Sequence, residues 1–107
     1  PMNWHKKMYV GESVKGKVRY YRFLILHTDK LTGLYCLLSP VNKDDQMEII
    51  RAENLRDPVY ARGDQTVLGL AGTRREAYYL AGAMMQDAYR KTGRYSIRQL
   101  FGLSETG

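Results

Sequence analysis

The order of apolar and polar residues in the first quarter of the chain predicts two β-strands. From Lys7 to Val14 the apolar positions fall loosely on one side of an extended chain. After Gly16 a longer strand is predicted from Lys17 to His27, with apolar residues on both faces. One face carries Val18, Tyr20, Leu24 and Leu26, and the other carries Tyr21, Phe23 and Ile25.

The next segments predict two more strands. Residues 28–33 have the composition of a turn, so residues 34–39 are expected to form the return strand of a hairpin, which Pro40 ends. A polar loop at residues 41–46 then leads into a strand at residues 47–52.

Residues 53–65 have the least regular pattern. Pro58 prevents a helix from running through them, because the residue before a proline avoids the helical conformation. A single helical turn at residues 58–61 fits the sequence. A turn at residues 63–64 then leads into a fifth strand at residues 66–71.

The segment from Thr73 to Gly93 has the start and stop signals of a long helix. The hydroxyl of Thr73 is expected to cap the first turn, and Glu76 three residues later is expected to complete a capping box. Gly93 follows two cations and suits a left-handed helix end. The residues on its apolar arc are Ala77, Leu80, Ala81, Met84 and Ala88.

The tail from Tyr95 to Phe101 fits either a short strand or one to two helical turns that begin at Ser96. We favour the helical turns, because Ile97, Leu100 and Phe101 would share one face.

These elements predict a single α+β domain over residues 1–107, with a five-stranded antiparallel sheet and one long C-terminal helix packed on it. One helix covers one face of such a sheet. Tyr21, Phe23 and Ile25, or the residues of the opposite face, therefore need another cover. A sheet curled into a closed barrel, a second subunit or a binding partner would supply it. The short tail element could also cover part of that face, so a homodimer or another assembly is one of the alternatives that the sequence leaves open.

The composition of the chain indicates the cellular compartment in which the protein is expected. No apolar run approaches the roughly 20 residues of a membrane span, and the basic, aromatic N-terminus does not resemble a signal peptide. A lone cysteine, Cys36, fits a reducing compartment. We therefore expect a cytoplasmic protein without a membrane partner.

The net charge of +6 is concentrated toward the N-terminus, where residues 1–40 hold seven Lys or Arg against two acids. A basic surface often has an anionic partner, with nucleic acid first among them. The same charge also serves simply to keep a small protein soluble. Charge alone does not decide between these interpretations.

Residues with catalytic or metal-binding chemistry are sparse. His5, His27 and Cys36 lack the short spacing of a zinc site, and we expect no metal and no cofactor. Cys36 and His27 are candidate neighbours across a hairpin, but the leucines around Cys36 indicate a buried thiol. The acids that could supply acid–base groups lie mostly in polar loops, at Asp44, Asp45, Glu48, Glu53, Asp57 and Asp64. The sequence therefore favours a non-enzymatic protein.

The glycines and arginines from Gly69 to Arg75 fall where a phosphate site could form at a helix start. The third glycine of a dinucleotide fingerprint and the Gly-Lys-Ser/Thr ending of a P-loop are both absent. Glu76 would also repel an anion. We interpret the segment as a tight turn from strand to helix.

Two clusters of bases and tyrosines are the candidate interaction sites. Arg19, Tyr21 and Arg22 form a cluster on the predicted strand. The exposed face of the predicted helix carries Arg75, Tyr79, Gln86 and Arg90. Tyrosine and arginine are favoured anchors of protein interfaces, and they also stack on nucleic-acid bases. We take protein interaction or self-assembly as the first hypothesis, and nucleic-acid binding as the second.

Several segments resemble a group of small uncharacterised proteins from Gram-positive bacteria. They are Tyr9–Val14, Leu34–Asn42, Met47–Ile50, Val67–Ala71 and Tyr89–Gly93, and together they span most of the chain. The resemblance implies a bacterial α+β domain. It brings no activity and no functional residue with it.

Overall fold

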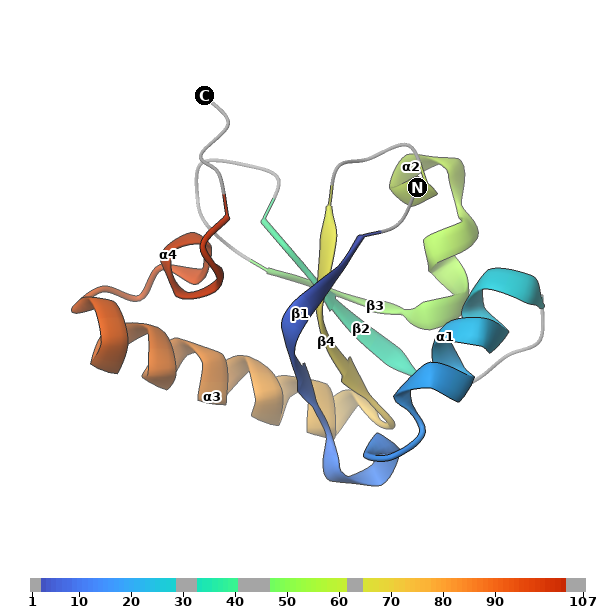
Figure 1. Cartoon of the computed structure of the whole chain (residues 1–107), viewed down its shortest axis with the longest axis horizontal. Helices are drawn as coiled ribbons and strands as arrows, with labels where there is room; N and C mark the ends of the chain where they lie inside the picture. The colour runs from blue at the N-terminus through green and yellow to red at the C-terminus, as the bar shows by residue number, and fades with distance from the viewer. Residues whose placement is uncertain (1–2, 29–32, 41–46, 62–64, 104–107) are drawn as a thin grey trace.

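The structure, a computed structural model, describes residues 3–28, 33–40, 47–61 and 65–103. In these residues four strands form one mixed sheet with the order β1-β4-β2-β3 (Figure 1). The strands are β1 (Asn3–Val10), β2 (Tyr35–Leu38), β3 (Glu48–Arg51) and β4 (Thr66–Ala71). The edge strand β1 runs parallel to β4, whereas β2 runs antiparallel to both β3 and β4. The predicted α+β class is confirmed, but the sheet has four strands rather than five and is not wholly antiparallel.

Helices cover both faces of this sheet (Figure 1). One face packs against α3 (Arg74–Thr92) and α4 (Ile97–Phe101). The other face packs against α1 (Val18–His27) and two short 3₁₀ turns, η1 (Glu12–Val14) and η2 (Ala52–Arg56), with α2 (Pro58–Ala61) after η2. The result is three layers, with the sheet in the middle.

Two apolar cores follow from this layering. The central strands β2 and β4 send side chains to both faces, so nearly every residue along them is buried. The core under α1 contains Val14, Ile25, Leu34, Cys36, Leu38, Ile50, Ala52, Leu55, Val67 and Leu70. The core under α3 contains Leu37, Leu68, Ala71, Ala77, Leu80, Met84, Ile97 and Phe101.

The segment predicted as a long strand is a helix, α1. Its inward face follows helical spacing: Ile25 is buried, and Tyr21, four residues earlier, packs against the same core. Strand alternation would place Tyr21, Phe23 and Ile25 on one face. In the helix Phe23 instead points to solvent, because it lies about 200° round the axis from Ile25.

This helix also removes the reason for expecting a barrel or a covering partner. The sheet is open, with β1 and β3 as its edges, and its second face is covered by α1 and η2 of the same chain. The uncovered apolar sheet face inferred from the sequence therefore does not exist. Any self-association has to be argued from other surfaces.

The long helix matches its prediction closely. Thr73 Oγ1 accepts a hydrogen bond from the Glu76 amide at 3.0 Å, and Gly93 ends α3 with φ of 76°. The capping box is altered, because the Glu76 carboxylate accepts from the Gly72 amide at 2.8 Å rather than from the Thr73 amide.

The other elements lie close to their predicted places. β4, α2 and the helical tail α4 are confirmed, and the Ser96 hydroxyl accepts a bond from the Gln99 amide to begin α4. The first strand is shifted toward the N-terminus, to Asn3–Val10. Residues 34–39 were expected to pair with the segment before them, but β2 pairs with β3 and β4. The predicted loop 41–46, turn 63–64 and most of the turn 28–33 lie outside the described residues.

The helical assignment of α1 predicts a large loss of stability at one apolar residue and a small change at another. Ile25→Ala should lower the free energy of unfolding by about 2–4 kcal/mol, because Ile25 is only 5% exposed and the change leaves a cavity. Phe23→Ala should change it by less than about 1 kcal/mol, because that ring faces solvent. Urea unfolding of both variants measures this difference. Equal losses at the two positions would contradict the helix.

Candidate interaction surfaces

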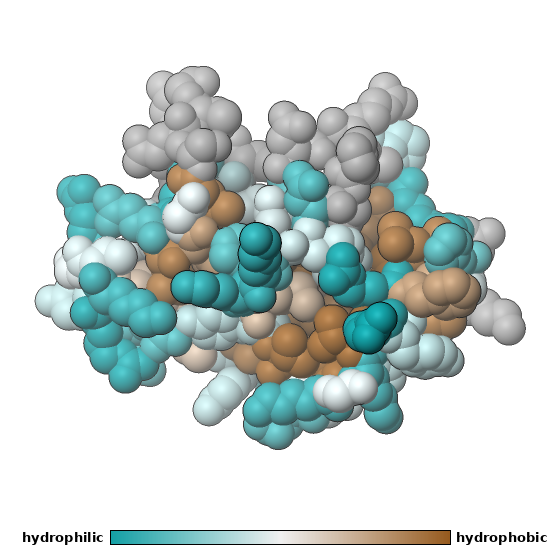
Figure 2. Space-filling model, viewed as in Figure 1, coloured by the Kyte–Doolittle hydropathy of each residue, from teal (hydrophilic) through white to brown (hydrophobic). Residues whose placement is uncertain are grey.

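The outer side of α1 presents large apolar side chains to solvent. Tyr20 is 59% exposed, Phe23 is 58% exposed and Leu26 is 52% exposed. Arginines stand between them, within about 160° of the helix circumference. We call this set the α1 surface: Arg19, Tyr20, Arg22, Phe23, Leu26 and His27. Figure 2 shows hydrophobic and hydrophilic side chains side by side at the surface over α1.

The α1 surface is also cationic. The sequence has no acidic residue from Ser13 to Thr28. The Arg22 guanidinium lies 4.9 Å from the centre of the Trp4 ring, and the His27 ring lies 4.6 Å from that of Phe23. Cationic and apolar groups thus alternate on a single rigid helix face.

A second surface lies on α3. Its outer side exposes tyrosines and arginines, and Tyr79 is 77% exposed. The Tyr89 ring stacks on Tyr95 with centroids 4.8 Å apart, and Arg90 pairs with Asp87. We call this set the α3 surface: Arg75, Tyr78, Tyr79, Gly82, Gln86, Tyr89 and Arg90.

Gly82 stands in the middle of the α3 surface. An exposed glycine inside a helix is about 1 kcal/mol less favourable than alanine, because it has more backbone freedom to lose. A Cβ atom built on Gly82 would meet no atom within 4 Å. Packing within the chain therefore does not account for the glycine.

The sequence-predicted site residues divide between these two surfaces. Arg19 and Arg22 lie on the α1 surface, whereas Tyr21 is half-buried against the core beneath α1. The predicted helix residues all lie exposed on the α3 surface: Arg75, Tyr79, Gln86 and Arg90. Because α1 and α3 pack on opposite faces of the sheet, the two clusters do not form one site.

Sequence reasoning missed the apolar members of the α1 surface. Tyr20, Phe23 and Leu26 were assigned to two faces of a strand, and the structure brings them to one side of a helix. A helical wheel drawn over residues 18–27 would have grouped them with Arg19 and Arg22.

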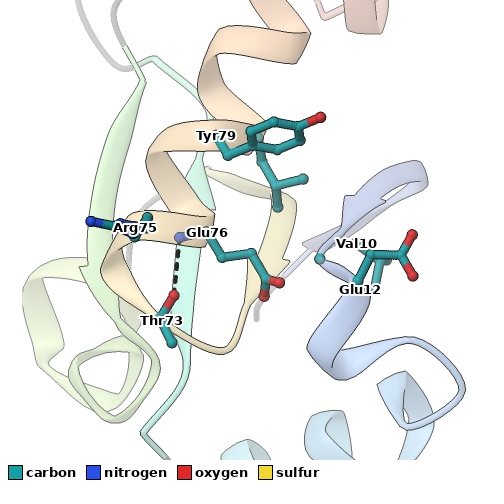
Figure 3. A pocket seen from close by; sticks show the side chains of 8 residues that line it. Val10, Glu12, Thr73, Arg75, Glu76 and Tyr79 are labelled. Carbon is teal, nitrogen blue, oxygen red and sulfur yellow. Dashed lines mark hydrogen bonds between the residues drawn. The ribbon is translucent and has the colours of Figure 1, made fainter.

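A shallow groove of about 480 Å³ lies beside the start of α3 (Figure 3). Arg75 and Tyr79 line it from α3, Val10 lines it from the end of β1, and Glu12 lines it from η1. In Figure 3 the Glu76 side chain extends from α3 toward the segment from Val10 to Glu12.

Glu76 joins the two walls of this groove. Its carboxylate accepts from the Ser13 hydroxyl at 2.6 Å and from the Ser13 amide at 3.3 Å, as well as from Gly72. These bonds, led by the Gly72 amide, lower the pKa of Glu76. A Cβ on Gly11 would lie 2.1 Å from the same carboxylate, so Gly11 permits the close approach. The carboxylate thus places a negative charge beside the start of α3 and occupies the Gly72 amide of the turn, in agreement with a structural turn.

Among the described residues, Cys36 and Tyr9 are two groups with catalytic chemistry that are buried or held in a hydrogen bond. Burial raises the pKa of the Cys36 thiol to about 12, and the cysteine is fully enclosed while His27 is exposed on α1. Burial and the hydrogen bond to Asp87 raise the pKa of Tyr9 to about 12, which keeps the phenol protonated. Among the described residues no three His, Cys, Asp or Glu side chains gather where they could hold a metal ion.

Both ring nitrogens of His5 have backbone partners. Nε2 donates to the Phe101 carbonyl at 2.8 Å, and Nδ1 accepts from the Lys7 amide at 3.0 Å. His5 lies in β1, where the pairing with β4 shifts register between Trp4 and Tyr9. The ring therefore holds an irregular part of the edge strand against α4, which is a structural role.

Comparisons of the chain with protein-family models, with curated proteins and with solved structures found no match. The resemblance to small Gram-positive proteins therefore stays a prediction. Within the described residues, no helix has the length and apolar character needed to cross a bilayer.

The Glu76 contacts predict a specific pH dependence. Its folded pKa lies below the ordinary value of 4.5, so its contribution to stability is present above that value and is lost as pH falls through the folded pKa. Glu76→Gln should lower the free energy of unfolding by about 1 kcal/mol at neutral pH, and by less in acid.

Urea unfolding at pH 7 and at pH 3 measures both values. Glu12→Gln is the control, because Glu12 makes a surface ion pair with Lys15 and should matter little. A loss from Glu76→Gln that is the same at both pH values would contradict the assignment.

Proposed function

We propose that this protein is a non-enzymatic interaction module whose α1 surface binds an acidic, partly apolar segment of another protein. The observation that carries the proposal is the exposure of Phe23 and Leu26 beside Arg19 and Arg22 on one helix face. Tyrosine and arginine are enriched among residues that dominate binding energy at protein interfaces, and this helix carries both types.

The apolar side chains give such a surface its binding energy. Fully burying a Phe or Leu side chain is worth about 1.5–3 kcal/mol, and each is about half exposed here. Covering both would therefore contribute roughly 2–3 kcal/mol. The arginines then favour an acidic partner. They raise the rate of its association more than they raise its affinity.

A nucleic acid is the second candidate. The net charge of +6 and the nine tyrosines favour it, since bases stack on aromatic rings and phosphates attract cations. The α1 surface fits a protein better, because exposed Leu26 has no ring on which a base can stack. The two candidates differ in how strongly salt should weaken binding.

We further propose a bacterial, cytoplasmic setting. The fully buried, unpaired Cys36 suits a reducing compartment, and the resemblance to small Gram-positive proteins supports the bacterial origin.

A peptide-display selection tests the proposal. Immobilised protein should enrich peptides that combine Asp or Glu with Leu, Phe or Trp. The tightest peptide, synthesised with a fluorescent label, should bind Phe23→Ala and Arg22→Glu at least about tenfold more weakly than wild type, as loss of a central interface residue does. Fluorescence anisotropy measures the affinities, and far-UV circular dichroism checks that each variant is folded.

Lys91→Glu is the matched control, because it makes the same change of charge on α3, in the opposite layer. It should keep the wild-type affinity. A labelled single-stranded RNA forms the other arm of the assay. Peptides without acidic residues, or binding that survives both α1 substitutions, would refute the protein interface. Tight, salt-sensitive RNA binding lost in Arg22→Glu would assign the α1 surface to nucleic acid instead.

A further inference from the structure

The glycine in the middle of α3 points to a close approach by another helix. Gly82 is exposed, a side chain there would touch nothing in its own chain, and glycine is one of the two residues that helices tolerate least. A missing side chain on the outside of a helix lets a second helix lie nearer than side chains normally permit. Tyr79 and Gln86 flank this gap on the same side of α3.

We propose that the α3 surface is a homodimer interface, in which α3 crosses α3 of a second copy in antiparallel orientation at Gly82. In a twofold dimer the same patch appears on both subunits, so the residues of α3 have to complement each other about a single point. The sequence of the exposed face has this property around Gly82.

The first complementary pair is Arg75 with Tyr89. Arg75 lies seven residues before Gly82 and Tyr89 lies seven residues after it, so an antiparallel crossing places each opposite the other on the second copy. Both would lie roughly 10 Å along the helix from the crossing point, at 1.5 Å per residue. One face of the Tyr89 ring stacks on Tyr95, and its other face is the kind of aromatic surface that attracts a guanidinium.

The second pair is Tyr79 with Gln86. They lie three residues before and four residues after Gly82, on the same exposed side of α3. A Gln side chain offers both a donor and an acceptor to a tyrosine hydroxyl, so each can satisfy the other across the axis.

The remaining charges are compatible with this crossing. Arg90, eight residues after Gly82, would come near Arg75 of the second copy. Each Arg90 is paired with Asp87 in its own chain. The repulsion between these cations is thereby reduced.

This inference is independent of the proposed function. The α3 surface and the α1 surface lie on opposite faces of the sheet, so dimerisation through α3 leaves both α1 surfaces exposed. A dimer would present two of them, and a partner with two acidic segments would gain avidity. Failure of either proposal leaves the other standing.

Gly82→Leu tests the dimer. Light scattering and sedimentation velocity over a wide concentration range should show a dimer for the wild type and a monomer for the variant. The substitution should raise the dissociation constant of the dimer at least about tenfold. The variant should keep its far-UV circular dichroism and cooperative unfolding, because the new side chain points into open space. Lys91→Leu is the matched control: it adds leucine to α3 half a turn away, and should leave the dimer intact.

A double-mutant cycle tests the register. Arg75→Ala and Tyr89→Ala should each weaken the dimer, and the double variant should weaken it by less than the product of the two single effects. A wild type that stays monomeric at every concentration would overturn the proposal. So would a Gly82→Leu variant that dimerises as tightly as the wild type, or a dimer that nuclease treatment dissolves.

Discussion

Burial of both faces of the central strands is the constraint on which the rest of this structure depends. Val67 and Leu70 of β4 pack in the core under α1, Leu68 packs in the core under α3, and all three are completely buried. Helices therefore have to pack on both sides of the sheet. Since their inner sides form the two cores, the outer sides of α1 and α3 become the broad surfaces available to another molecule.

The features that the sequence predicted well are those determined by residues close together in the chain. The ends of α3 depend on Thr73 and Gly93, each of which acts within one helical turn, and both take part as expected. Glu76 also binds a nearby amide, but it is that of Gly72 and not that of Thr73. The parallel pairing of β1 with β4 joins residues sixty or more positions apart, and no local pattern indicates it. For the same reason, the sequence did not show that α1 and η2 of this chain cover the second face of the sheet.

The error at α1 has a physical cause that also concerns the site. The helix has no side-chain cap at Lys17 and no acid in its first turn, so the usual start signals are missing. Tyr20, Phe23 and Leu26 are apolar residues on the solvent side of α1. Because of them the segment lacks a wholly polar helix face, and its sequence fits a strand with two apolar faces. Departures of this kind are expected at functional or strained sites. The arginines of the candidate site could thus be predicted from the sequence, whereas its apolar residues could not.

Packing, rather than local propensity, holds α1 in place, and this affects binding. The Arg56 guanidinium donates to the carbonyl oxygens of Ile25 and Leu26 at 3.2 and 2.9 Å, which satisfies acceptors that the helix end leaves open. Ile25 anchors the inner side in the core. The backbone beneath Phe23 is therefore ordered before a partner arrives, and little of its conformational entropy remains to be lost on binding. Apolar area covered on such a surface converts to affinity more fully than area covered on a segment that must first fold.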